Sequence, residues 1–464
     1  MTLVACVDFG STYTKALLVD VDSGDLVART EHPTTIGTDV LDGWLACRAE
    51  LIAQDSGAAA ADVVACSSAG GGLRIAVVGQ EELVTAEAGR RVSLSSGGAV
   101  VHVASGGLAS GIEPLRASRP DVVLLVGGTD GGNPAVLVDA ADRLAAAAWS
   151  GPVVVAGNAA AASDVVDRLD AAGVDHVVAD NVVPQIGVLR PDSARAAIRE
   201  MFLRHVIGGK RLSASAEFLD MVVGPTPDIV LSGVELLAEA VGDVVVVDVG
   251  GATTDVHSAV TLDPETLSPE LGGLAREVVA PTPLTRTVEG DLGMRWSAPT
   301  TVARGVAAGL VDDTDAVALG AAAERRAADP GWLPDGPADV EAEYDLATTA
   351  VGIALRRHAG RQRVVFGPEG RLVERQGVDL REVELLVGSG GVLRHAPGER
   401  AAAVLRESTG EDVSGGWLLP RSPRLVVDQE YVLAAAGLLR ADYTDAAATL
   451  LRQRLTSAQD PTDA

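Results

Sequence analysis

Two short segments of the 464-residue chain carry the residue types that bind a phosphate chain together with Mg²⁺. They are Asp8-Phe9-Gly10-Ser11-Thr12 with Lys15 on the return strand, here called turn 1, and Asp248-Val249-Gly250-Gly251-Ala252-Thr253-Thr254-Asp255, here called turn 2. Glycine allows a tight bend whose backbone N–H groups point outward, and hydroxyl side chains add further donors. A carboxylate can hold Mg²⁺ through the water molecules that this small ion retains.

Either turn alone is also compatible with an ordinary β-hairpin that has glycine in its bend. Two copies in corresponding places of two repeated units favour phosphate binding over that simpler interpretation. A third segment, Leu385–His395, reads LLVGSGGVLRH and indicates a buried strand, a Gly-Ser-Gly-Gly turn and the start of a helix. Its glycines would let a flat base or a ribose approach the backbone closely.

The elements around these segments indicate a repeated α/β unit. Short strands are expected at Leu3–Asp8, Lys15–Val21 and Leu26–Glu31, followed by a helix over Thr38–Ala53. From residue 121 the chain alternates valine-rich strands with helices, which is typical of parallel strands buried on both faces. The strand–turn–strand pattern restarts near residue 243. Further helices are predicted at Ala303–Ala327, Val340–His358 and Asp428–Leu439.

The restart near residue 243 predicts a duplicated β-rich unit. We expect residues 1–241 to form an N-terminal lobe with an inserted α/β segment and residues 242–424 to form a C-terminal lobe. Residues 425–464 are predicted to be C-terminal helices that pack back on the N-terminal lobe.

Composition excludes several classes of protein. The chain is 47% hydrophobic with 52 glycines, which argues against intrinsic disorder. Lysine and arginine total 37 against 64 acidic residues, and the net charge of −27 disfavours binding to nucleic acid or anionic lipid. Cys6, Cys47 and Cys66 are too few for a disulfide framework, and Cys6 and Cys66 are expected to be buried free thiols. The absence of a signal-peptide pattern or a bilayer-spanning apolar stretch predicts a cytoplasmic location without membrane contact.

The order of the three segments resembles that of the actin/Hsp70/sugar-kinase superfamily of ATP-binding proteins. The resemblance implies an α/β fold of duplicated actin/Hsp70-like (ribonuclease H-like) ATPase lobes, with a cleft between them for ATP and Mg²⁺. Asp8 and Asp248 would lie on opposite lobes as catalytic residues that hold Mg²⁺, through water. The implied phosphate contacts are Gly10, Ser11, Thr12, Lys15, Gly250, Gly251, Thr253, Thr254 and Asp255, and the implied adenosine contacts are Gly388, Ser389, Gly390 and Gly391.

A closer resemblance covers almost the whole chain. It rests on CSSAGGGLRIAVVG (66–79), VGGTDGGN (126–133), GKRLSASAEF (209–218), GPTPDIVL (224–231) and RTVEGDLGMR (286–295). These segments are similar to the GlmL family, also called MutL, the accessory protein encoded beside adenosylcobalamin-dependent glutamate mutase and unrelated to the mismatch-repair protein of that name. The resemblance implies an ATP-dependent partner or reactivating factor, of chaperone type, whose partners are the mutase subunits.

The glycine-rich segment at residues 126–133 is predicted to lie at the carboxyl end of a strand, where α/β ligand sites cluster. Asp130 could position a water molecule or act as a general base, or it could hold the backbone of its own loop. Three functions therefore stay open: a weak ATPase that acts on a partner protein, a small-molecule kinase with Asp130 as its base, and an ATP sensor without turnover.

Other candidate motifs are set aside. Gly209-Lys210 fails the P-loop pattern because Arg204 and Arg211 occupy positions that require Gly and Ser or Thr. Asp255-Val256-His257 begins the DxHxxG signature of cobalamin binders, but Val260 ends the match, so we do not expect this chain to bind cobalamin in that way. Glu289 and Asp291 are expected to lie in a solvated loop.

Overall fold

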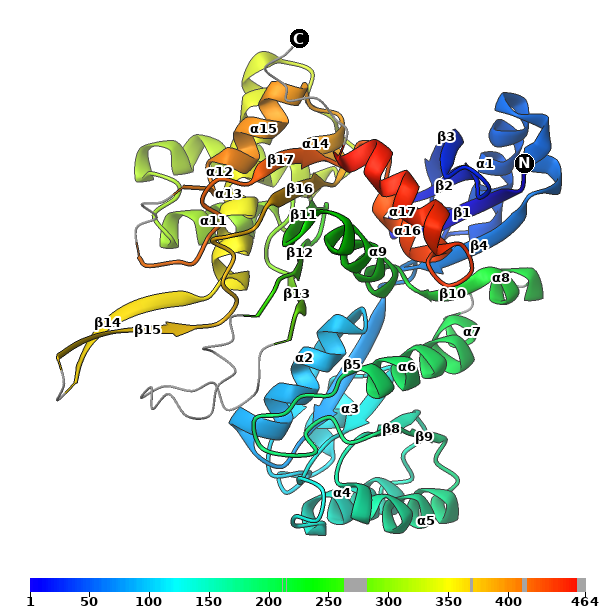
Figure 1. Cartoon of the computed structure of the whole chain (residues 1–464), viewed down its shortest axis with the longest axis vertical. Helices are drawn as coiled ribbons and strands as arrows, with labels where there is room; N and C mark the ends of the chain where they lie inside the picture. The colour runs from blue at the N-terminus through cyan, green and yellow to red at the C-terminus, as the bar shows by residue number, and fades with distance from the viewer. Residues whose placement is uncertain (211, 214, 263–281, 368–369, 411–414, 457–464) are drawn as a thin grey trace. The chain divides into compact units, whose positions relative to one another are not determined.

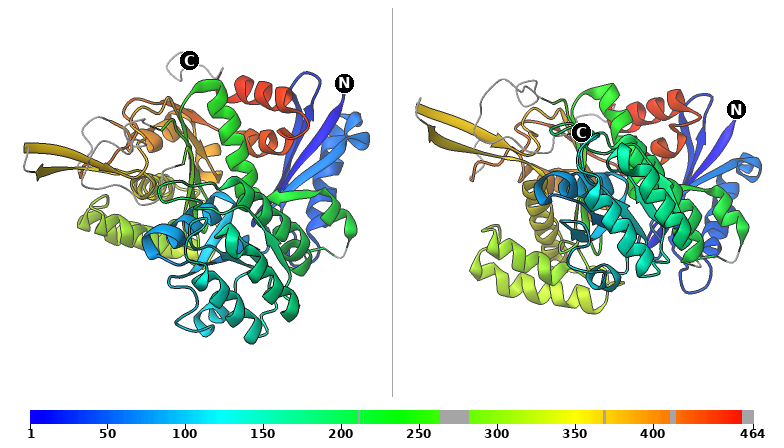
Figure 2. Two further views of the ribbon diagram at one scale, coloured as in Figure 1. Left: turned by 60° about the horizontal axis from the view of Figure 1, so that its bottom comes forward. Right: turned by 90° about the horizontal axis from the view of Figure 1, so that it is seen from below.

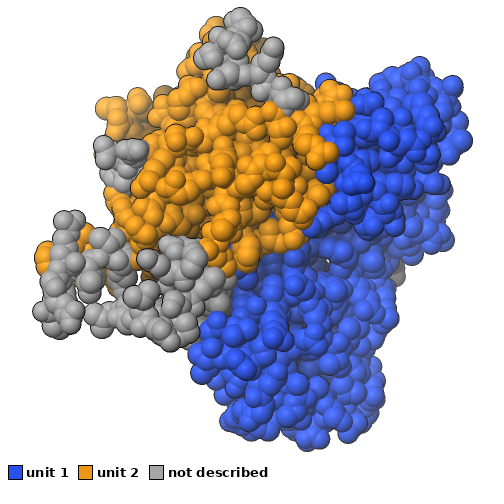
Figure 3. All heavy atoms as spheres, viewed as in Figure 1, with its two compact units in different colours: residues 1–233, 277–282, 434–449 blue, residues 234–276, 283–433, 450–464 orange. Residues whose placement is uncertain are grey.

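The computed structural model describes residues 1–210, 212–213, 215–262, 282–367, 370–410 and 415–456. Contacts divide the chain into two compact units, which are coloured separately in Figure 3. Unit 1 is built mainly from Met1–Gly233 and Ala434–Thr449, and unit 2 contains most of residues 234–433.

The first sheet of unit 1 has the order β10-β4-β1-β2-β3 (Figure 1). The central strand β1 pairs antiparallel with β2 and parallel with β4, β2 pairs antiparallel with β3, and β10 pairs parallel with β4. The strands are β1 (Leu3–Phe9), β2 (Tyr13–Asp20), β3 (Asp25–Pro33), β4 (Asp62–Ser67) and β10 (Val222–Pro225).

The sheet of unit 2 repeats this arrangement with the order β13-β12-β11-β16-β17. Its central strand β11 pairs antiparallel with β12 and parallel with β16. The outer strands follow the same scheme, because β13 pairs antiparallel with β12 and β17 pairs parallel with β16. The strands are β11 (Val244–Val249), β12 (Thr254–Ala259), β13 (Leu284–Glu289), β16 (Leu385–Ser389) and β17 (Arg424–Val427). The predicted duplication of an α/β unit is thereby confirmed.

An insert between the fourth and fifth strands of the first sheet forms a second sheet of unit 1, with the order β6-β5-β7-β8-β9. All of its pairings are parallel, as the valine-rich runs predict. The strands are β5 (Leu73–Val78), β6 (Gly98–Ala104), β7 (Val122–Leu125), β8 (Val153–Val155) and β9 (His176–Val178). Its longer helices are α2 (Glu87–Ser95), α4 (Ala135–Ala146), α5 (Ala162–Ala172) and α6 (Asp192–Met201).

The remaining helices correct the sequence prediction in two places. The helix predicted over Ala303–Ala327 is two helices, because Gly309 adopts φ 66° between them. Asp428 does not begin a helix but follows β17, four residues before α16 (Val432–Leu439).

The remaining helices of the two units are α1 (Val40–Gln54), α3 (Glu113–Ala117), α7 (Ile207–Gly209), α8 (Ala216–Met221), α9 (Thr226–Val241), α11 (Ala298–Ala307), α12 (Asp313–Ala328), α13 (Pro337–His358), α14 (Gly391–Arg394), α15 (Gly398–Arg406), α16 (Val432–Leu439) and α17 (Thr444–Leu451).

A two-stranded ribbon was not predicted from the sequence. It consists of β14 (Arg361–Gly367) and β15 (Gly370–Gln376), which pair antiparallel with each other. Figure 2 shows the ribbon standing apart from the five-stranded sheet of the same unit, and the side chain of Phe366 is 83% exposed.

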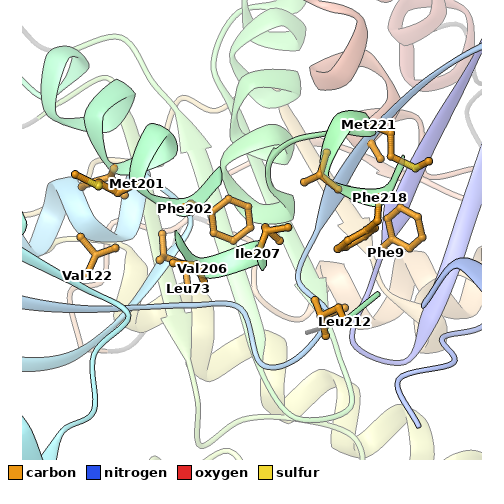
Figure 4. Close-up of a cluster of buried hydrophobic side chains, with 14 of the residues drawn as sticks. Phe9, Leu73, Val122, Met201, Phe202, Val206, Ile207, Leu212, Phe218 and Met221 are labelled. Carbon is orange, nitrogen blue, oxygen red and sulfur yellow. The ribbon is translucent and has the colours of Figure 1, made fainter. Parts of the chain in front are cut away.

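The core of unit 1 fixes which way the side chains of β1 point. Val7 and Phe9 are fully buried in the main hydrophobic cluster, and Phe9 meets the ring of Phe218 edge to face at 5.1 Å (Figure 4). Because successive side chains of a strand alternate between faces, Asp8 must point away from this cluster. Burial of its two neighbours therefore orients the carboxylate of turn 1.

Replacing Phe9 with Ala should reduce the free energy of unfolding by about 3–5 kcal/mol, because it leaves a cavity beside Phe218. Urea unfolding of the full chain, followed by circular dichroism, measures the change. The matched control is Phe366→Ala at the exposed position of the ribbon, which should change stability by less than about 0.5 kcal/mol. Equal effects of the two substitutions would contradict this account of the core.

Candidate functional site

Turn 1 is a tight bend between β1 and β2. The backbone N–H of Gly10 donates to the carbonyl of Tyr13 at 3.1 Å, and a Cβ on Gly10 would lie only 2.6 Å from that oxygen. Glycine is therefore required at this position. Ser11 and Thr12 are exposed beside the bend. The strand register places Asp8 opposite Lys15, whose Nζ lies 3.9 Å from Asp8 Oδ2.

The other carboxylate oxygen of Asp8 is bound by residues from two more elements. Thr226, the first residue of α9, donates its hydroxyl to Asp8 Oδ1 at 2.6 Å. The thiol of Cys66 on β4 lies 3.6 Å from the same oxygen. The pKa of Cys66 is raised mainly by burial and to a lesser extent by the charge of Asp8. The group next to the carboxylate is therefore a neutral thiol. Asp8 itself is 8% exposed and is thus held in one orientation.

A glycine loop after β4 lies against turn 1. The N–H groups of Ser68 and Ala69 both donate to the carbonyl of Phe9 at 3.0 Å. Gly70, Gly71 and Gly72 follow with φ values of 69°, 90° and 67°. Lys210 Nζ donates to the carbonyls of Gly70 and Gly72, so the side chain of Lys210 braces this loop.

Turn 2 has the same backbone bend in unit 2. The N–H of Gly250 donates to the carbonyl of Thr253 at 2.9 Å, and a Cβ on Gly250 would lie 2.9 Å from that oxygen. Where turn 1 pairs Asp8 with a lysine, turn 2 pairs Asp248 with Asp255 across the strands. The positive charge comes instead from β13, where Arg286 Nε donates to Asp255 Oδ1 at 3.0 Å.

The segment after β13 packs against turn 2. Met294 and Arg295 donate their N–H groups to the carbonyls of Gly250 and Gly251 at 3.0 and 2.7 Å. The ring of Trp296 lies over Gly251, because a Cβ there would be 2.9 Å from the ring, yet the side chain is 55% exposed. The fluorescence of this indole can therefore report changes at turn 2.

The predicted solvated loop at Glu289 and Asp291 is wrong. Arg357 Nη1 lies 2.6 Å from a carboxylate oxygen of each residue. Burial raises the pKa of Glu289, whereas the hydrogen bond from Arg357 lowers that of Asp291. The prediction failed because the glycines around these two acids carry no information about Arg357, which lies 66 residues beyond Asp291 in the chain.

The Gly-Ser-Gly-Gly segment lies at the same sheet edge as turn 2. Strand β16 pairs parallel with β11, and Ser389 is the register partner of Asp248. Gly390 adopts φ 96°, and a Cβ there would lie 2.2 Å from the carbonyl oxygen of Val249. A Cβ on Gly391 would meet no atom within 4 Å of the described chain.

Sequence reasoning missed three residues near the Gly-Ser-Gly-Gly turn, namely Arg394, Asp428 and Tyr431. The guanidinium of Arg394 lies 3.9 Å from the ring centroid of Tyr431, a residue with φ 60°. Buried Asp428 accepts the N–H groups of Val432 and Leu433 at 2.9 and 3.1 Å, and burial raises its pKa. Arg394 Nε also donates to the carbonyl of Gln429 at 3.1 Å, so Arg394 joins α14 to the segment after β17, 35 residues further along the chain.

Asp130 lies at the carboxyl edge of the insert sheet, where the strand order reverses between β5 and β7. Its Oδ1 accepts hydrogen bonds from Ala159 N at 3.0 Å and Asn181 Nδ2 at 2.8 Å. Asn158 Nδ2 also donates to the carbonyl of Gly132 at 3.0 Å. The two partners lie 29 and 51 residues further along the chain, so the side chain of Asp130 joins its loop to the segments after β8 and β9, and these contacts are not the expected turn around its own backbone. Asp130 and Asp8 lie on different sheets, and a catalytic role for Asp130 stays a prediction.

The donor set of turn 1 fits a water-mediated Mg²⁺ ion better than a directly ligated metal. In the described part of the chain, no group of three or more His, Cys, Asp or Glu side chains could hold a metal ion. Mg²⁺ keeps several of its water molecules and is usually bound by one or two carboxylates together with phosphate oxygens of the substrate.

None of the described helices has the length and apolar composition needed to cross a membrane.

Solved structures show distant similarity. The nucleotide-free acetone carboxylase is 15% identical, with 95% of this chain and 70% of that chain covered and a TM-score of 0.41. The activator of 2-hydroxyisocaproyl-CoA dehydratase from Clostridium difficile, with bound ADPNP, is 10% identical, with 96% of each chain covered and a TM-score of 0.30.

Sequence similarity is much closer. The family model described as MutL protein matches residues 4–455. Protein MutL from Clostridium tetanomorphum is 35% identical over 463 residues, which cover 97% of this chain and 98% of that protein. The chain therefore belongs to the MutL protein family.

Proposed function

We propose that this protein binds ATP with Mg²⁺, hydrolyses it weakly, and acts as an accessory or reactivating protein for an adenosylcobalamin-dependent mutase of the glutamate mutase type. The observation that carries the ATP part is the pair of bends with equivalent Gly10 and Gly250 hydrogen bonds at the ends of equivalent central strands. The partner part rests on membership of the MutL family.

The residues of unit 1 supply an oriented acid and a cation that faces it. Asp8 is fixed by Thr226 and faces Lys15, so it can hold the water shell of Mg²⁺ without first losing side-chain freedom. Lys15 can turn towards a phosphate oxygen when one is present. The exposed hydroxyls of Ser11 and Thr12 can add neutral donors.

The residues of unit 2 supply the second acid and the nucleoside contacts. Asp248 adjoins Ser389 in the sheet, and the open space at Gly391 admits a flat group next to the backbone. Positioning and charge stabilisation of this kind are the main requirements for phosphoryl transfer. In the proposed function one nucleotide is bound by both turns.

ATP can do mechanical work on a partner only if it binds one conformation of the protein more tightly than another. A γ-phosphate gives both turns something to contact, whereas ADP offers fewer oxygens. We infer that this difference in contacts is what distinguishes the ATP state from the ADP state. The kinase alternative has weaker support, because one carboxylate oxygen of its base candidate, Asp130, already accepts hydrogen bonds from Ala159 N and Asn181 Nδ2.

The substitutions Asp8→Ala and Asp248→Ala should each weaken Mg²⁺-dependent ATP binding at least about tenfold, equivalent to about 1.4 kcal/mol, because each removes one carboxylate from the ion's water shell. Isothermal calorimetry on the full chain measures the affinities. Asp167→Ala, an exposed acid on α5, is the matched control and should bind as the wild type does. An effect of only one turn would contradict binding of one nucleotide by both.

Gly391→Ala should leave stability unchanged but weaken ATP binding at least about tenfold, because the new methyl group would occupy the space assigned to adenosine. Gly390→Ala should instead destabilise unit 2 by about 1–3 kcal/mol, through strain at positive φ and the clash with Val249. Thermal unfolding and calorimetry separate the two effects. Wild-type affinity in a folded Gly391→Ala protein would place adenosine elsewhere.

The reactivating role predicts that inactivated glutamate mutase regains activity when this protein, ATP, Mg²⁺ and fresh adenosylcobalamin are added together. Recovery should require ATP and should be absent with Asp8→Ala, because the nucleotide drives the change in the partner. Mutase activity before and after addition is the measurement. ATP turnover that is accelerated by a metabolite, with a phosphorylated product, would support the kinase alternative instead.

A further inference from the structure

The N-terminal end of α9 contacts turn 1 on one side and the insert on the other. Thr226, its first residue, donates to Asp8 Oδ1 at 2.6 Å. The two residues are 218 positions apart in the chain, so this contact is made only by the tertiary fold. A side-chain hydrogen bond to a carboxylate is short and directional, so it selects one orientation of that carboxylate.

Two residues further along α9, Asp228 is fully buried and bound by two arginines. Arg195 Nη2 donates to Oδ1 at 3.0 Å, and Arg199 Nε donates to Oδ2 at 2.7 Å. Both arginines belong to α6 of the insert, which packs against β8 and β9. Removing one partner of a buried ion pair is strongly unfavourable, so this cluster ties α6 firmly to the end of α9.

A second contact from the insert meets the same residue. Gly97, in the bend before β6, adopts φ 79°, and a Cβ there would lie 2.9 Å from Asp228 N. The backbone of the insert therefore approaches the first residues of α9 as closely as glycine permits. Little space is left for this end of α9 to move without moving the insert.

We propose that Thr226 positions Asp8 for the water shell of Mg²⁺, and that the cluster of Asp228, Arg195 and Arg199 transmits the occupancy of this site to α6 of the insert. This inference rests on the proposed ATP-binding function. When the water molecules of Mg²⁺ donate to the oxygens of Asp8, they compete with the hydroxyl of Thr226, so the bond from Thr226 must adjust. Asp228 lies on the same helical turn, so the adjustment reaches the two arginines.

The positioning role is tested by Thr226→Val, which keeps the shape of the side chain but removes the hydroxyl, and by Thr226→Ser, which keeps the hydroxyl. Calorimetry with ATP is carried out on each full-length protein in Mg²⁺ and in EDTA. Thr226→Val should weaken ATP binding about tenfold in Mg²⁺ but less than about twofold in EDTA. Thr226→Ser should bind ATP in Mg²⁺ with the affinity of the wild type. Equal losses in both conditions, or wild-type binding by Thr226→Val, would overturn this role.

The coupling is tested by hydrogen–deuterium exchange of α6, Asp192–Met201, with and without Mg²⁺ and ATP. Exchange should change on ATP addition in the wild type, and the change should vanish in Arg199→Met. The matched control is Arg143→Met, which breaks an ion pair of α4 with Asp139 in the same insert and should respond as the wild type does.

The outcomes separate the inference from the function on which it rests. A wild-type protein that does not bind ATP removes the proposed function and the inference together. ATP binding without any change in exchange of α6 overturns only the coupling. So does an Arg199→Met protein that responds to ATP as the wild type does.

Discussion

Alternation of side chains along a buried central strand is the constraint on which both candidate phosphate turns depend. In unit 1, Val7 and Phe9 are fixed in the core, and Asp8 must therefore face the opposite side of β1. In unit 2, Val247 and Val249 fix Asp248 in the same way. A shift of one residue in either register would turn the carboxylate into the hydrophobic cluster and turn its apolar neighbours to the opposite face. The hydrophobic core thus determines the chemistry at the strand ends.

The two turns share a backbone but not a charge distribution. Turn 1 carries its own cation on the return strand, whereas the acid at the corresponding position of turn 2 is neutralised by Arg286 from the next strand. A lysine that faces a carboxylate at 3.9 Å can exchange that partner for phosphate, but an arginine held in a buried pair is less free to do so. Under the proposed function, the two turns would therefore present different charges to the nucleotide.

Local signals in the sequence were sufficient to predict the duplicated sheets and both glycine bends. Strands such as β1, β5 and β11 are apolar runs followed closely by glycine, and this signal lies within each strand's own residues. Thr226 and Arg286 were missed because their partners are distant in the chain and only the tertiary fold brings them together. The break at Gly309 was missed because one glycine is compatible with a continuous helix pattern.

The most direct test of one nucleotide bound by two turns is a double-mutant cycle with Asp8→Ala and Asp248→Ala, measured by calorimetry with Mg²⁺ and ATP. The account predicts one site per chain in the wild type and a loss in the double variant that is smaller than the sum of the single losses, because both acids act on the same ion. Two sites per chain, or losses that add fully, would show that the turns act independently and would contradict the account.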